Sequence, residues 1–244
     1  MFRRIVLASV SVFALTAAAS AADMYVPGPT GPGGYKDEYV PVWSWTGFYA
    51  GAEGGGNWGN SSIYDLLLHR PETNSFGLSG GLFGGTVGYN YQVAPHWVIG
   101  IEDDISWTDK SGSGVDIHVA TTNNTVTERW LDTLRGRIGY AWDRVLVYGT
   151  GGAAFGSTDL KVCGTAGCFT QSGVSRTGWT AGGGVEWAFA HNWSAKAEYL
   201  HVDFGDADYT SSPAPFDHRR VSLTDDIGRV GINYHILPAY EPLK

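Results

Sequence analysis

Charged residues are scarce in this chain, and basic residues are scarcer than acidic ones. Asp, Glu, Lys and Arg make up 16% of the 244 residues, with 16 Lys and Arg against 24 Asp and Glu. Because binding to phosphate backbones needs clustered Lys and Arg, this balance argues against nucleic acid as a partner. The aromatic content of 14% argues against disorder. The 35 glycines, which weaken helix interiors, favour an all-β chain.

No segment after the N-terminus reads as a membrane-spanning helix. The N-terminal residues have the features of a secretory signal peptide. Arg3 and Arg4 precede an uncharged apolar stretch, and Ala19-Ser20-Ala21 fits the cleavage pattern of such a peptide. The stretch is short and no basic stop-transfer cluster follows, so a signal peptide over 1–21 is favoured over a membrane anchor. The Pro- and Gly-rich residues 22–44 predict a flexible segment.

Only two cysteines are present, Cys163 and Cys168. Export places them in an oxidising compartment, and a zinc site needs four ligands. Their spacing therefore predicts a small disulfide that clips a loop.

From residue 45 to residue 236 the sequence alternates with a period of two. Val87 and Tyr89 lie on one parity, and Thr86 and Asn90 lie on the other, as in a strand with one apolar face. Eight such segments of roughly ten residues occur, the length that a tilted strand needs to cross a bilayer. Residues 237–244 are expected to form a C-terminal tail.

The predicted connections alternate between short and long. Tight turns are expected at 94–96, 142–144 and 190–192. Long polar loops are expected at about 59–80, 108–127, 157–175 and 205–220. Short turns on one side and long loops on the other are typical of an outer-membrane barrel, with the long loops extracellular and both termini in the periplasm.

One parity of the strands collects nearly all their charge. The members are Glu53, Glu102, Asp104, Arg135, Arg137, Glu186, Lys196, Glu198 and Arg229. Nine charges in the apolar lumen of a soluble barrel would be very costly. On the lipid face of a membrane barrel, a base costs roughly 2–4 kcal/mol, whereas in the lumen the charges can pair. The pattern predicts an eight-stranded antiparallel transmembrane up-and-down barrel with a lumen charge network. A two-sheet sandwich is the structural alternative.

Tryptophans support the same fold, because eight of the ten lie near strand ends. Those beside the tight turns are Trp97, Trp142, Trp187 and Trp193. Those at the long-loop ends are Trp58, Trp107, Trp130 and Trp179. Two levels of Trp match the aromatic girdles at the two membrane interfaces.

Asp103 and Asp132 share the apolar parity. One hypothesis is that they hold divalent cations that bridge lipopolysaccharide phosphates.

Several segments resemble a known family. Leu131-Asp-Thr-Leu-Arg-Gly-Arg-Ile-Gly-Tyr140 and Leu146-Val-Tyr-Gly-Thr-Gly-Gly-Ala-Ala154 resemble the small opacity-protein-like outer-membrane barrels of alphaproteobacteria. The resemblance implies an eight-stranded barrel of the porin-like, immunogenic outer-membrane type, with a role in envelope integrity or host contact. Such barrels usually end on an aromatic residue that the assembly machinery reads, whereas residues 237–244 follow the last strand here.

Signals for catalysis are weak. The glycines of 149–154 superficially match a dinucleotide loop, but no helix-forming segment follows them. The sequence contains no Gly-x-Ser-x-Gly motif and no His-Glu-x-x-His motif. We expect no enzyme, no metal and no cofactor, although haemin binding by His69, His118 or His218 in the loops is left open.

Three functions follow from these expectations. The first is a structural or surface-interaction protein of the cell outer membrane, a surface antigen whose lumen is filled by side chains. The second is a narrow passive porin, and the third is a haemin- or ligand-binding protein. The expected partners are outer-membrane lipid, lipopolysaccharide, the barrel assembly machinery, and a host or surface ligand at the loops.

Overall fold

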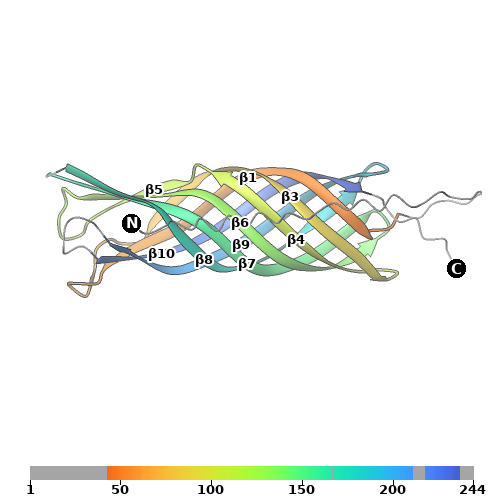
Figure 1. The fold of residues 1–244 in the computed structure, drawn as a ribbon, viewed down its shortest axis with the longest axis horizontal. Helices are drawn as coiled ribbons and strands as arrows, with labels where there is room; N and C mark the ends of the chain where they lie inside the picture. The colour runs from red at the N-terminus through yellow and green to blue at the C-terminus, as the bar shows by residue number, and fades with distance from the viewer. Residues whose placement is uncertain (1–42, 166, 211–217, 237–244) are drawn as a thin grey trace, which may run out of the picture. The chain divides into compact units, whose positions relative to one another are not determined.

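The computed structural model describes residues 43–165, 167–210 and 218–236, which form an antiparallel β-structure (Figure 1). The predicted signal peptide over 1–21, residues 22–42 of the Pro- and Gly-rich segment, and the tail over 237–244 lie outside the described residues. The described residues include no helix that is long and apolar enough to cross a membrane.

Eight strands close into a ring. They are β1 (Gly47–Asp65), β3 (Phe76–Ala94), β4 (Trp97–Thr108), β6 (Asn123–Trp142), β7 (Val145–Gly164), β8 (Gly167–Ala188), β9 (Trp193–Thr210) and β10 (His218–Ile236). Neighbouring strands are antiparallel, and β1 pairs with both β10 and β3, which closes the barrel. Figure 1 shows the strands running obliquely around the barrel. The predicted eight-stranded antiparallel barrel is confirmed.

The connections follow the predicted alternation, but the strands are longer than expected. The tight turns lie at Pro95–His96, Asp143–Arg144 and 189–192, and Asp143 adopts the left-handed φ of 51° that Asp tolerates in turns. At the other end, which we call the outer end, β7 and β8 run on to Gly164 and Gly167. The loop predicted over 157–175 is therefore wrong, because this segment is a β-hairpin. Two short strands, β2 (Arg70–Pro71) and β5 (Ser111–Val115), extend the sheet at the outer end.

The barrel is apolar on the outside of its central part. Ile101, Ile138 and Val230 are between 54% and 64% exposed there. At the outer end the arrangement reverses, because Leu160, Val221 and other apolar side chains form a buried cluster. Apolar and aromatic side chains also fill the barrel at the tight turns, which we call the turn end. The charged residues lie between these two apolar clusters.

Candidate functional site

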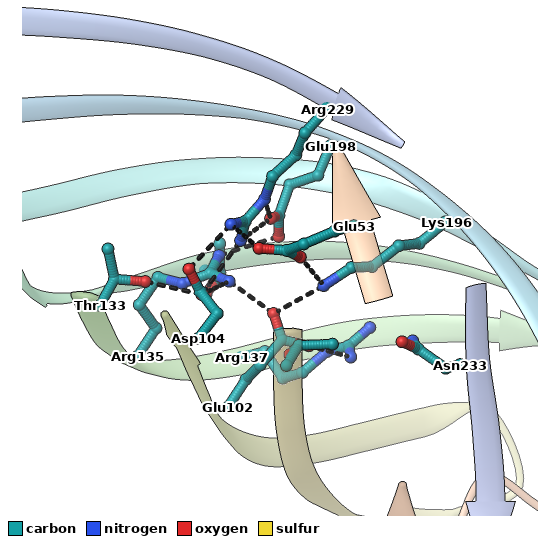
Figure 2. Close-up of polar contacts among 12 residues, drawn as sticks. Glu53, Glu102, Asp104, Thr133, Arg135, Arg137, Lys196, Glu198, Arg229 and Asn233 are labelled. Atoms are coloured by element: carbon teal, nitrogen blue, oxygen red, sulfur yellow. Dashed lines mark hydrogen bonds and ion pairs between the residues drawn. The ribbon is translucent and has the colours of Figure 1, made fainter. Parts of the chain in front are cut away.

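The interior of the central barrel holds all nine residues of the predicted lumen charge network, each at most 5% exposed. They come from β1, β4, β6, β8, β9 and β10, and alternation along each strand turns them to one face. The strand registers place opposite charges side by side, as for Glu102 and Arg135 on β4 and β6, or Glu198 and Arg229 on β9 and β10. Figure 2 shows the charged side chains converging from these strands.

Two arginines share two carboxylates at the centre of the network (Figure 2). Arg135 reaches Asp104 Oδ2 at 2.7 Å and Glu198 Oε1 at 2.9 Å. Arg229 reaches the second oxygen of each carboxylate, Asp104 Oδ1 at 2.8 Å and Glu198 Oε2 at 2.5 Å. Arg229 also pairs with Glu53. Since β4 and β10 are not neighbours in the sheet, the Asp104–Arg229 contact crosses the lumen.

The remaining charges lie on the turn-end side of this centre. Arg137 reaches Glu186 Oε2 at 2.8 Å and stacks on the Tyr148 ring, with its guanidinium carbon 3.9 Å from the ring centroid. Lys196 Nζ lies 2.9 Å from Glu53 Oε2 and 3.2 Å from Glu102 Oε1. Each of the nine charges therefore has an oppositely charged partner within 2.9 Å.

An aromatic plug closes the turn end. Trp45 is fully buried, its indole N–H donates to the Asp143 carbonyl at 3.2 Å, and its main-chain N–H donates to Gln92 Oε1 at 3.1 Å. Trp43 packs edge-on against Trp45 and is 6% exposed. Trp43 and Ser44, the last two residues of the segment predicted to be flexible, are thus buried at the turn end of the barrel.

Sequence reasoning missed a second buried charge cluster nearer the outer end. Lys110 Nζ lies 2.9 Å from Glu128 Oε2, also pairs with Asp225, and donates to Asn57 Oδ1 at 3.5 Å. None of these four residues is more than 1% exposed. Lys110 lies in the loop predicted at about 108–127, where strand parity carries no information.

The predicted interface tryptophans lie on the outward face. Seven are 44–61% exposed, and Trp130 is half-buried beside its strand partner Trp107. The predicted disulfide joins Cys163 and Cys168, which face each other across the tip of the β7–β8 hairpin.

Other candidate ligand residues are not assembled into a metal centre. Asp103 and Asp132 lie half-buried on the outward face of the neighbouring strands β4 and β6. His69 and His118 are exposed near the outer end, and His118 Nε2 lies 3.1 Å from the Pro71 carbonyl. Within the described ranges, no three His, Cys, Asp or Glu side chains are grouped to hold a metal ion. The lipopolysaccharide-cation and haemin hypotheses remain predictions.

Comparison with known proteins agrees with this geometry. Residues 5–217 match the family described as the outer membrane protein beta-barrel domain. The chain is 32% identical to a 31 kDa outer-membrane immunogenic protein of Brucella melitensis, over 95% of this chain and 99% of the relative. It is 31% identical to a 22 kDa outer membrane protein of Rhizobium leguminosarum, over 72% of each chain.

Among solved structures, the outer membrane protein OprG of Pseudomonas aeruginosa aligns with a TM-score of 0.50 at 11% identity, covering 80% of this chain and 99% of that one. This likeness concerns the fold alone. With the family match, the identity to full-length relatives and the closed barrel, the chain belongs to the outer membrane protein β-barrel family of alphaproteobacteria and is a protein of the bacterial outer membrane.

Proposed function

We propose that this protein is a structural and surface-interaction component of the outer membrane, with an interior closed to solute flow and an outer end that presents its recognition surface. The observation that carries the proposal is the cross-lumen charge network, in which Arg135 and Arg229 share Asp104 and Glu198. A barrel of eight strands is just wide enough for side chains to fill it. Side chains paired across the lumen would fill the space that a water channel needs.

The two apolar clusters support the same proposal. On the outer side of the network, Leu131, Leu200, Leu223 and Ile227 are buried inside the barrel. On the turn side, Trp45 closes the interior. A hydrated solute would have to lose most of its water shell at both levels, because the side chains that fill both clusters are mainly apolar.

The lipid surroundings form part of the proposal. The exposed apolar side chains and the two levels of Trp suit a lipid bilayer with lipopolysaccharide around the outer level. The names of the Brucella relatives describe immunogenic proteins, which fits a surface-exposed outer end. The barrel assembly machinery would recognise the strand ends.

The proposal includes no catalysis. Ser194, His235 and Glu186 lie together at the turn end, but the Ser194 hydroxyl donates to Glu186 Oε1 at 2.6 Å, and all three side chains are buried. A nucleophilic serine instead needs its base as hydrogen-bond acceptor and a path to substrate.

Planar-bilayer conductance tests the closed interior. The detergent-extracted protein is first shown to be folded by a change in gel migration between unboiled and boiled samples. We expect this folded protein to produce no steady channels after insertion. Reproducible unitary currents from folded protein would overturn the closed interior and favour a narrow passive porin.

A further inference from the structure

The pairing between β8 and β9 ends earlier than the pairing on either side of it. The β8–β9 register runs from Ala188 opposite Ser194 to Trp179 opposite Asp203. By contrast, β8 stays paired with β7 as far as Gly167, and β9 stays paired with β10 as far as Thr210. In the described part of the chain, residues 167–178 of β8 therefore have no strand-pairing partner on the β9 side. Between this stretch and β9, the Arg176 side chain donates hydrogen bonds to the Tyr209 hydroxyl at 3.3 Å and to the Gly205 carbonyl at 3.5 Å.

This free edge lies beyond Trp179, which belongs to the outer level of tryptophans, and so stands outside the bilayer. In Figure 1 the β7–β8 hairpin extends at the outer end of the barrel. A strand with one partner leaves alternate main-chain N–H and C=O groups unpaired, and this periodic array is complemented by another extended chain.

The edge lacks the charges and prolines that commonly prevent unwanted pairing. Natural edge strands are guarded by charged residues and Pro. Residues 167–178 contain no Asp, Glu, Lys or Pro. Their one charged residue, Arg176, is turned inward and is 3% exposed, donating to Thr158 Oγ1 and to the Val221 carbonyl at 3.0 Å each. Gly173, with φ of 72° at a register shift, divides the edge into two straight stretches, 167–171 and 174–178.

Across the gap that opens between β8 and β9 at the outer end, β9 is protected against pairing with another strand. Between 203 and 210, β9 carries Asp203, Asp206 and Asp208. Gly205 bends it with a φ of 56°. The contrast between the two edges marks β8 as the one suited to pairing. The carboxylates of Asp203 and Asp206 also disfavour an acidic chain in the gap, because like charges on adjacent strands repel, whereas Asp208 is paired with Arg220.

The edge is held in place before any partner arrives. The Cys163–Cys168 disulfide clips the hairpin tip, and Val174 packs against the buried apolar cluster of the outer end. A rigid edge loses little conformational entropy when it binds, which favours affinity.

We propose that the free edge of β8, residues 167–178, binds an extended, uncharged polypeptide segment of an extracellular partner by adding it to the sheet as a further strand. Main-chain hydrogen bonds would supply the affinity, and the outward side chains of the edge would supply the selectivity. This inference rests on the surface-interaction role proposed above and names the partner class.

The test uses the full mature chain in lipid nanodiscs and a labelled synthetic peptide of about ten residues with alternating Thr and Val. We expect saturable binding, with the amides of 167–178 becoming protected from hydrogen exchange. A second peptide with Glu in place of Thr is expected to bind at least about tenfold more weakly. Absence of saturable binding, or protection elsewhere only, would overturn the proposal.

The matched variants place two lysines either on the edge or away from it. Thr170→Lys with Ser172→Lys guards the edge and is expected to weaken binding at least about tenfold. Ala120→Lys with Thr121→Lys adds the same charge at exposed turn positions and is expected to bind like the wild type. Equal binding by both double variants would show that the edge is not the peptide-binding site. A folded, non-conducting barrel that fails to bind the peptide would leave the closed interior intact and refute only this inference.

Discussion

Asp104 and Arg229 form an ion pair across the lumen, with Oδ1 and Nη1 2.8 Å apart, although their strands are separated in the sheet by β3 and β1. Arg135 holds the other oxygen of the same carboxylate from the neighbouring strand β6. The Asp104 carboxylate thus links three strands, β4, β6 and β10. Contacts of this kind connect opposite walls, whereas main-chain hydrogen bonds connect only adjacent strands.

The first prediction concerns this network. Arg135→Met leaves Glu102, Asp104 and Glu198 with one cation fewer in a buried site. Removing one partner of a buried ion pair typically costs about 3–5 kcal/mol of unfolding free energy. We expect the variant to unfold at markedly lower urea concentration in detergent micelles, followed by tryptophan fluorescence.

Arg220→Met is the matched control for that experiment. Arg220 pairs with Asp208 at 2.8 Å, but both side chains are about half exposed. Because exposed ion pairs contribute little, this variant is expected to unfold like the wild type. Equal unfolding curves for Arg135→Met and Arg220→Met would contradict the structural role of the lumen charges.

The second prediction concerns the aromatic plug. Trp45→Ala removes a fully buried indole and its hydrogen bond to the Asp143 carbonyl. Large-to-small changes of this size cost about 3–5 kcal/mol. Trp97→Ala, which removes a side chain that is 49% exposed, is the control and is expected to cost less. A Trp45→Ala barrel as resistant to urea as the Trp97→Ala barrel would show that the plug is not part of the folded core.

The third prediction concerns pH and the outer end. Glu72 follows β2, outside the bilayer, and pairs with Arg219 Nε at 2.6 Å. Burial raises the pKa of the Glu72 carboxyl above its usual 4.5, with Arg219 offsetting part of the rise and Asp116 adding to it. The folded state therefore binds the proton more tightly than the unfolded state. The stabilisation is complete below about pH 4.5 and is lost as the pH rises through the raised pKa.

Hydrogen exchange corrected for the intrinsic rate measures this effect. The Ile117 amide, which donates to the Glu72 carbonyl at 2.8 Å, is expected to be better protected at the acidic end of the range. Glu72→Gln should flatten the pH dependence of its protection. An unchanged slope in that variant would assign the dependence to another group.

The sequence predicts the barrel and its charged centre well because one physical rule holds along the membrane-spanning part of each strand. On β10, Arg229 and Asn233 face inward, while Val230 and Ile232 face lipid. This alternation can be recognised directly in the sequence. The ion-pair partners across the lumen cannot be predicted from the sequence, because they depend on the barrel's shear rather than on spacing within a strand.

The outer end escaped prediction because the rule reverses there. On β10 the buried apolar residues Val221, Leu223 and Ile227 share the parity of Arg229, while Val230 has the other parity. Outside the bilayer the exterior meets water, so the apolar face turns inward. The sequence does not show where the lipid ends. These residues therefore interrupt the expected alternation, and the strand extensions resemble loops. The same change of environment hid Lys110 and its carboxylate partners.

The final prediction tests the orientation of the barrel faces directly. Val230 is 64% exposed and lies on β10 between Trp58, whose strand partner is Asp226, and the Trp193–Tyr234 pair. Val230→Lys places a charge toward the middle of the lipid-facing band, at a cost of roughly 2–4 kcal/mol. The control Thr165→Lys puts the same charge at the exposed hairpin tip, outside lipid. The free energy of unfolding in lipid vesicles should therefore be lower for Val230→Lys than for Thr165→Lys. If both unfold like the wild type, Val230 does not face lipid, and the assignment of the apolar exterior to the bilayer is wrong.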